Sequence, residues 1–190
     1  MANEFFISDT HFFHNNIIDY CGRPFANAEE MNEAIVRNWN SIVAPDDVVH
    51  HLGDFVLGQA DHVPQIIDRL NGHIILCRGN HDTKAKLALY AQRPDKITVK
   101  DIDYVEYKGL FFVGCHFPMT NEEFLKMVSE DNSEVVVVHG HVHEKADFYT
   151  PETHVFNVSA DVTNFSPVPI SLMYELVRQD FIEKGVWRGK

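Results

Sequence analysis

The sequence predicts an α/β protein in which two β-sheets pack together and are flanked by helices. First, apolar runs alternate with amphipathic helical stretches up to Pro94, as in parallel βαβ units. Second, hairpin-like patterns take over from Asp103 onward. Third, five apolar runs end in Asp, Asn or His, four of them beside a glycine, and α/β proteins bind ligands outside the carboxyl ends of their strands. The length suits one domain over residues 1–190.

In the amino-terminal half, three buried strands are expected to lead into polar turns: residues 4–8, the run that starts at Val48, and residues 74–77. Residues 9–26 are expected to form a loop. A helix then begins after Asn27, with Glu30 as the partner of a capping box. Its apolar residues recur at helical spacing and indicate a core-facing stripe: Met31, Ile35, Trp39 and Ile42. Two more helices are expected over 63–70 and 83–92.

The carboxyl-terminal half is expected to be richer in strands. Residues 103–107 and 110–115 flank Lys108-Gly109, which is typical of a tight hairpin. Thr120 and Glu123 form a second capping box, which predicts a helix. The remaining strands are expected at 134–139, 154–158 and 170–174, with Pro167 and Pro169 in the loop between the last two.

The composition narrows the possible partners. A net charge of −12 argues against a broad electrostatic grip on duplex DNA or on anionic lipid. It leaves a phosphorylated substrate open, because bound divalent cations reverse the charge locally. No apolar run approaches the roughly 20 residues that a membrane span requires.

The expected compartment is the cytoplasm. Cys21, Cys77 and Cys115 are odd in number and share no metal-like spacing, so a disulfide framework is not expected. The chain enters its first strand within four residues, which leaves no room for a signal peptide.

Candidate functional residues gather at the ends of five apolar runs. Each block by itself is compatible with an ordinary turn. Together they indicate a site, because the carboxylate, amide and imidazole groups can bind metals or carry protons. The blocks are Asp9-Thr10-His11, Gly53-Asp54, Gly79-Asn80-His81-Asp82, Gly114-Cys115-His116 and Gly140-His141-Val142-His143.

These five blocks, in this order, resemble those of the calcineurin-like metallophosphoesterase family. The compact length, Ser8-Asp9-Thr10-His11-Phe12 and Arg23-Pro24-Phe25 are similar to the small phage and bacterial members. The resemblance implies a four-layer αββα sandwich of two mixed sheets, with a dinuclear metal site at the carboxyl ends of the strands. It implies a first metal held by Asp9, His11, Asp54 and His143, and a second held by Asp54, Asn80, His116 and His141.

The implied chemistry is hydrolysis of a phosphoric ester. A water that bridges two divalent ions becomes an in-line nucleophile, and by resemblance His81 is the proton donor to the leaving group. Asp82 is a candidate to orient His81. Nitrogen and oxygen ligands suit Mn, Fe, Zn, Co or Ni, of which we favour Mn.

Four further residues are weaker candidates. His14, Arg23 and Arg78 are candidates to contact substrate phosphate. A solvated loop or a structural contact explains His14 and Arg23 better, and pairing with an acid is the alternative for Arg78. His139 precedes the ligand pair and is either a support for the metal ligands or simply the end of a strand.

The sequence also constrains the substrate. The serine/threonine phosphatase branch continues Gly-Asp with Asp-Arg-Gly, whereas this chain continues Gly53-Asp54 with Phe55-Val56-Leu57, which argues against a protein phosphatase. The short intervals between blocks leave no cap domain. We therefore expect a phosphorylated small molecule or nucleotide, with a diester slightly favoured over a monoester. Single-stranded nuclease action is a competing activity, and a non-catalytic scaffold on the same fold is the alternative outside enzymes, although the presence of His81 argues against it.

Overall fold

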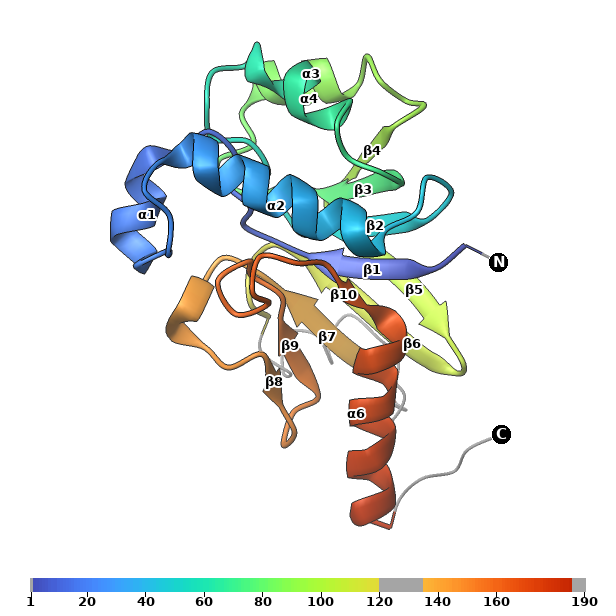
Figure 1. Ribbon diagram of the computed structural model, residues 1–190. Helices are drawn as coiled ribbons and strands as arrows, with labels where there is room; N and C mark the ends of the chain where they lie inside the picture. The colour runs from blue at the N-terminus through green and yellow to red at the C-terminus, as the bar shows by residue number, and fades with distance from the viewer. Residues whose placement is uncertain (1, 120–134, 186–190) are drawn as a thin grey trace.

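The computed structural model describes residues 2–119 and 135–185, which form two five-stranded sheets stacked on one another (Figure 1). The strand order is β10-β1-β2-β3-β4 in the first sheet and β5-β6-β7-β9-β8 in the second. The strands of the first sheet are β1 (Glu4–Ile7), β2 (Val48–His51), β3 (His73–Cys77), β4 (Ile97–Lys100) and β10 (Val168–Pro169). Those of the second are β5 (Asp103–Tyr107), β6 (Leu110–Cys115), β7 (Val135–His139), β8 (Tyr149–Thr150) and β9 (Val155–Asn157).

Both sheets are mixed, as the sequence predicted. In the first sheet β1 to β4 are parallel and only β10 runs antiparallel, so the carboxyl ends of β1, β2 and β3 meet at one edge. In the second sheet β6, β7 and β9 are parallel, and β5 joins β6 through the predicted hairpin. Both turn residues of that hairpin have positive φ, 50° at Lys108 and 86° at Gly109, which matches the twist of the strands.

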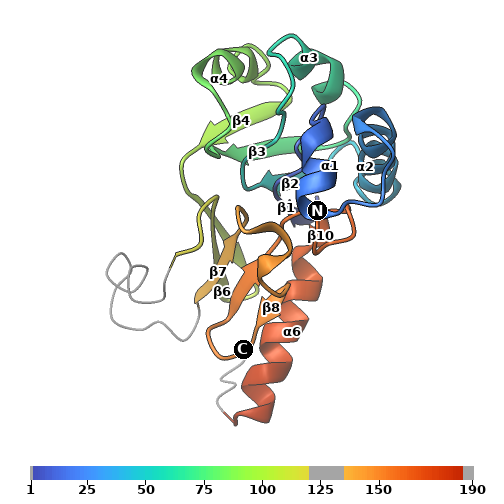
Figure 2. The same ribbon diagram turned by 90° about the vertical axis from the view of Figure 1, so that its left-hand side faces the viewer.

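The helices α1 to α4 lie on the side of the first sheet that faces away from the second sheet, and α6 runs beside the second sheet (Figure 2). The Asn27 side chain caps α2 by accepting a hydrogen bond from the Glu30 amide, as the capping box predicted. The helix bounds are α1 (Asn15–Cys21), α2 (Ala28–Ile42), α3 (His62–Ile67), α4 (Lys84–Tyr90), η1 (His143–Lys145) and α6 (Ile170–Glu183).

Two apolar cores follow from the alternation of side chains along β1. Phe5 and Ile7 point to the core between the first sheet and helices α1 to α4, which also contains Trp39. Phe6 points the other way, into the core between the two sheets, where it meets Phe112. A strand buried on both faces in this manner explains the uninterrupted apolar run in the sequence.

The predicted strand at 170–174 is wrong, because these residues form the start of helix α6. The buried residues of α6 recur with helical spacing: Ile170, Met173, Tyr174, Val177 and Phe181. The β-branched and aromatic residues at the start of this segment suggest a strand, but the helical period becomes clear only over all fourteen residues.

The structure also adds elements that the sequence did not predict. Residues 15–21, expected to be loop, form the short helix α1, which ends at Gly22 in the left-handed conformation. The short strands β4, β8 and β10 were not predicted either. The helix expected after Thr120 lies outside the described residues. Among the residues that are described, no helix has the length and apolar character of a membrane span.

A buried charged pair between the sheets leads to a prediction about stability. The imidazole of His50 in β2 forms a hydrogen bond with the carboxylate of Asp103 in β5, and both side chains are almost fully buried. Burial by itself would lower the pKa of His50, but the Asp103 and Glu4 carboxylates outweigh it and raise that pKa. Burial would likewise raise the pKa of Asp103, but His50 and Lys100 lower it. The pair therefore contributes stability above the unfolded pKa of Asp, about 4, and loses it as pH rises through the folded pKa of His50.

We expect Asp103→Asn to lower the free energy of unfolding by about 3 kcal/mol near pH 5.5, because it removes the closer of the two carboxylates that face the buried imidazolium and leaves only Glu4. Urea unfolding in the presence of a chelator measures this. The loss should be smaller near pH 8.5, because the charge on His50 is lost as pH rises through its raised pKa. Asp101→Asn, at an exposed carboxylate two residues away, is the control and should change stability by less than about 1 kcal/mol. An equal loss for Asp103→Asn at both pH values would contradict the charged pair.

Candidate metal centre

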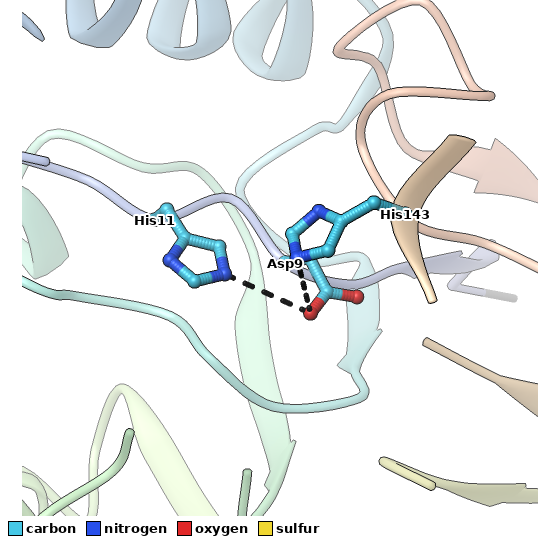
Figure 3. Close-up of side chains that lie close together, drawn as sticks. All are labelled: Asp9, His11 and His143. Atoms are coloured by element: carbon cyan, nitrogen blue, oxygen red, sulfur yellow. Dashed lines mark ion pairs between the residues drawn. The ribbon is translucent and has the colours of Figure 1, made fainter. Parts of the chain in front are cut away.

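The first group of candidate ligands consists of Asp9, His11 and His143. Asp9 and His11 follow β1, and His143 comes from the segment after β7. Figure 3 shows both imidazoles beside the same Asp9 carboxylate. The Nε2 atoms of His11 and His143 lie 3.8 and 4.0 Å from Asp9 Oδ1. Nitrogen and oxygen atoms at these spacings can surround one cation.

Asp54 lies at the centre of the whole constellation. Its Oδ2 atom is 3.6 Å from His11 Nε2, 3.5 Å from His116 Nε2 and 3.9 Å from His81 Nε2. Its other oxygen, Oδ1, accepts a hydrogen bond from the His81 amide at 2.8 Å. One oxygen is thus held by the backbone while the other faces three imidazoles.

The second group surrounds His116. Its Nε2 atom lies 2.8 Å from Asn80 Oδ1 and 3.2 Å from His141 Nδ1. Its Nδ1–H donates to the carbonyl of Leu52 at 2.8 Å, which turns the lone pair of Nε2 toward the site. The seven residues expected as metal ligands are therefore brought together in two adjoining groups joined by Asp54.

Asp9 uses its two oxygens differently, as Asp54 does. Oδ2 accepts hydrogen bonds from the His141 amide at 2.8 Å and from the Ser159 hydroxyl at 2.9 Å. Oδ1 is buried and has no hydrogen-bond partner, and the same is true of His11 Nε2. Unpaired buried polar atoms are costly, and cations between these atoms would satisfy them. The residues present therefore fit a pair of divalent cations.

The local electrostatics agree with that fit. Burial would raise the pKa of Asp9, but the surrounding histidines hold it below its usual range, so the carboxylate is ionised. Burial lowers the pKa of His11 to about 4. At neutral pH this imidazole is uncharged, and its lone pair is available to a cation.

The backbone is strained at the same residues. Five of the seven candidate ligands adopt the left-handed conformation that non-glycine residues rarely occupy: Asp9 (φ 54°), His11 (φ 49°), Asp54 (φ 54°), His141 (φ 70°) and His143 (φ 52°). Such conformations cluster at functional sites, because the surrounding fold must hold them.

Glycines allow the ligand segments to approach closely. A Cβ atom at Gly79 would lie 2.2 Å from Asp54 Oδ1, and one at Gly140 would lie 2.3 Å from Asp9 Oδ2. Both positions therefore exclude a side chain and bring one ligand-bearing turn against the carboxylate of another.

His81 and Asp82 complete the turn after β3. The His81 side chain is 50% exposed and projects beside Asp54, so its ring can reach a bound molecule. The Asp82 carboxylate accepts hydrogen bonds from the amides of Gly79 and Asp54, each at 2.9 Å. Asp82 thus ties the turn that carries Asn80 and His81 to the segment that carries Asp54.

Two hollows adjoin the candidate ligands. A cavity of about 370 Å³ adjoins the first group and is lined by His11, His14, Ile17, Tyr20, Cys21, Leu57, His81, His143, Glu144 and Lys145. A cavity of about 650 Å³ adjoins the second group and is lined by Arg78, Gly79, Asn80, Asp82, Thr83, Lys84, Asp101, Ile102, Cys115, His116, Phe117 and Met119. Each group of candidate ligands therefore adjoins a hollow of its own.

The four weaker candidates lie in different surroundings. His14 lines the smaller hollow and stacks on His11, and Arg78 lines the larger one, where it pairs with Asp101. Arg23 does not face either hollow: its side chain is fully buried and bonded to Asp161, which leaves it no access to a substrate phosphate. His139 is buried and donates through Nδ1 to the Gly140 carbonyl, beside the backbone of His141.

Sequence reasoning missed Ser159 and Asp161. The Ser159 hydroxyl donates a hydrogen bond to Asp9, and the Asp161 carboxylate accepts one from His143, so both residues hold candidate ligands in place. They follow β9 directly, and the rule that selected the five blocks, polar residues after an apolar run, would have selected them too. The expected strand at 154–158 corresponds to β9 (Val155–Asn157), and Ser159 and Asp161 lie just beyond its end.

Comparison with known proteins agrees with the fold. The model of the calcineurin-like phosphoesterase superfamily domain matches residues 4–166. The chain therefore belongs to the calcineurin-like phosphoesterase superfamily, as its five blocks predicted.

Two relatives extend over nearly the whole chain. This chain is 36% identical to uncharacterized protein MJ1445 of Methanocaldococcus jannaschii, in an alignment that covers 97% of this chain and 94% of that protein. The crystal structure of AQ665, a protein of unknown function from Aquifex aeolicus, is similar with a TM-score of 0.72 and 27% identity, covering 93% of this chain and all of that one.

Proposed function

We propose that this protein hydrolyses phosphoric esters with two divalent cations and prefers phosphodiesters to monoesters. One observation carries the proposal: Asp9 and Asp54 each hold one carboxylate oxygen with protein donors and turn the other toward two or more imidazoles. A structural role would have used both oxygens in hydrogen bonds.

The first cation would be held by Asp9, His11, Asp54 and His143, and the second by Asp54, Asn80, His116 and His141. When bound, the pair supplies a water acidified to act at neutral pH and neutralises charge on the phosphoryl oxygens. The donor set suits several first-row metals, and we favour Mn²⁺.

His81 is the proposed proton donor to the leaving alkoxide. Its ring is half exposed, adjoins Asp54 Oδ2 and lines the smaller hollow, which supports that hollow as the leaving-group side. Asp82 is proposed to orient His81 indirectly, because its carboxylate holds the turn that carries His81 through the amides of Gly79 and Asp54. His14, in the same hollow, is proposed to contact the departing group.

The preference for diesters rests on the two hollows. A monoester has one organic substituent, whereas a diester has two, which leave the phosphorus in different directions. Ile17, Tyr20 and Leu57 offer apolar surface to the leaving group, and Phe117 and Met119 offer it to the retained group, with Arg78 beside them. A cytoplasmic nucleotide or similar phosphorylated molecule fits this division.

The test is an assay of protein first stripped of metal by a chelator and then loaded with Mn²⁺. Matched chromogenic monoester and diester substrates are compared. We expect no hydrolysis after chelation, recovery on loading, and a higher kcat/KM for the diester by about tenfold, the equivalent of roughly 1.4 kcal/mol of extra transition-state binding. Binding of two metal ions without hydrolysis of either substrate would favour a scaffold instead. A higher kcat/KM for the monoester would overturn the diester preference alone.

A further inference from the structure

A buried pair of charged residues lies behind the first group of ligands. Arg23 and Asp161 are 138 residues apart in sequence, and their side chains form two hydrogen bonds, Nε to Oδ1 at 2.8 Å and Nη2 to Oδ2 at 2.9 Å. The exposed fractions of the two side chains are 0% and 4%. A bidentate pair of this kind fixes the position of both groups.

Asp161 also contacts a candidate metal ligand. Its Oδ2 atom accepts a hydrogen bond from His143 Nδ1 at 2.7 Å. With the proton on Nδ1, the lone pair of His143 lies on Nε2, the atom that faces Asp9 Oδ1. Asp161 therefore sets both the tautomer and the direction of the His143 ring.

Arg23 contacts the other side of the same ligand group. Its Nη2 and Nη1 atoms donate to the backbone carbonyls of Asp9 and Thr10 at 2.8 and 3.0 Å. Asp9 is one of the residues held in the left-handed conformation, so these hydrogen bonds oppose its relaxation. One guanidinium thus holds the backbone of one ligand and the carboxylate that orients another.

We propose that Arg23 and Asp161 are positioning residues that hold Asp9 and His143 in the arrangement that binds the first cation. The inference rests on the proposed function only in assuming that this group binds a metal. It differs from a role of Arg23 in substrate binding, since the guanidinium is buried and its donors are directed to Asp161, Asp9 and Thr10.

A competing use of Asp161 must be separated from this one. Cys21, His143 and Asp161 have ligand atoms within 4.8 Å of one another and could together hold a thiophilic ion. Both Asp161 oxygens already accept from Arg23, and burial raises the pKa of the Cys21 thiol to about 12, which opposes a thiolate. Cys21→Ser should therefore leave metal binding unchanged.

The experiment measures Mn²⁺ binding by calorimetry, with electron paramagnetic resonance of the coupled ion pair as a second readout. In Asp161→Asn we expect the affinity of one ion to fall by about 10–100-fold and that of the other to be retained. Arg23→Lys keeps the positive charge but not the planar set of guanidinium donors, and it should lower the Mn²⁺ affinity by a similar factor. If the two residues act as a unit, the double variant should lose no more than the larger single loss.

Asp103→Asn is the matched control, because it removes the charge of another buried aspartate, one that is paired with His50, which is not a candidate ligand. It should lower stability and leave Mn²⁺ affinity unchanged. Wild-type Mn²⁺ affinity at both sites in Asp161→Asn would overturn the positioning role, whereas a folded Arg23→Lys that binds both ions normally but has a raised KM would return Arg23 to substrate binding. Two ions bound by the wild-type protein without hydrolysis would refute the proposed function and leave this inference standing.

Discussion

Replacing Asp54 with asparagine is expected to reduce kcat/KM by roughly a thousandfold or more, the equivalent of about 4 kcal/mol of lost transition-state stabilisation. The change keeps the size of the side chain and removes its charge. Oδ2 of Asp54 lies 3.6 Å from His11 Nε2 and 3.5 Å from His116 Nε2, so it adjoins a histidine of each group. Losing this charge should weaken both proposed ion positions rather than one.

Metal analysis beside the kinetic assay checks this prediction. We expect fewer than two Mn²⁺ ions per Asp54→Asn chain after dialysis, against two for the wild type. The backbone contact from the His81 amide to Oδ1 can persist with an asparagine oxygen, so the fold should be retained. Full occupancy by two ions together with normal turnover would show that Asp54 is not shared between them.

Replacing His81 with alanine is expected to lower turnover by about 10²–10⁴-fold, the range of general acid–base catalysis, while metal content stays the same. The side chain is half exposed, and its backbone rather than its ring holds the turn, so its removal should disturb the ligands little. The loss should depend on the substrate. A leaving group of low pKa, such as a nitrophenolate, needs little help from an acid, whereas an alkoxide needs it most.

The matched control for His81→Ala is His14→Ala, which removes another imidazole from the same hollow. It should affect KM more than kcat, because the proposed role of His14 is contact with the departing group. Loss of metal from His81→Ala would make His81 a ligand instead of a donor. An equal reduction for nitrophenyl and alkyl esters would also remove it from the proposed step.

Much of the fold could be predicted because its signals are local. The alternation of buried residues in β1, the capping box of α2 and the hairpin at Lys108-Gly109 each occupy a few consecutive residues. The prediction was wrong where a helical pattern extends over more residues than the five that were assigned to a strand. Helix α6 begins with strand-like residues, and its helical period appears only over the whole segment. The helix α1 was not predicted because it has only seven residues and their composition is typical of a loop.

The sequence by itself determined that polar groups end five apolar runs, and parallel strands bring such ends to one edge. That is why all seven expected ligands meet in the structure. Only the tertiary structure decided how they are held: the left-handed backbone at five of them, the close approach at Gly79 and Gly140, and the contact of Arg23 with Asp161. These features depend on packing between segments far apart in the chain, and no local pattern of residues encodes such a distance.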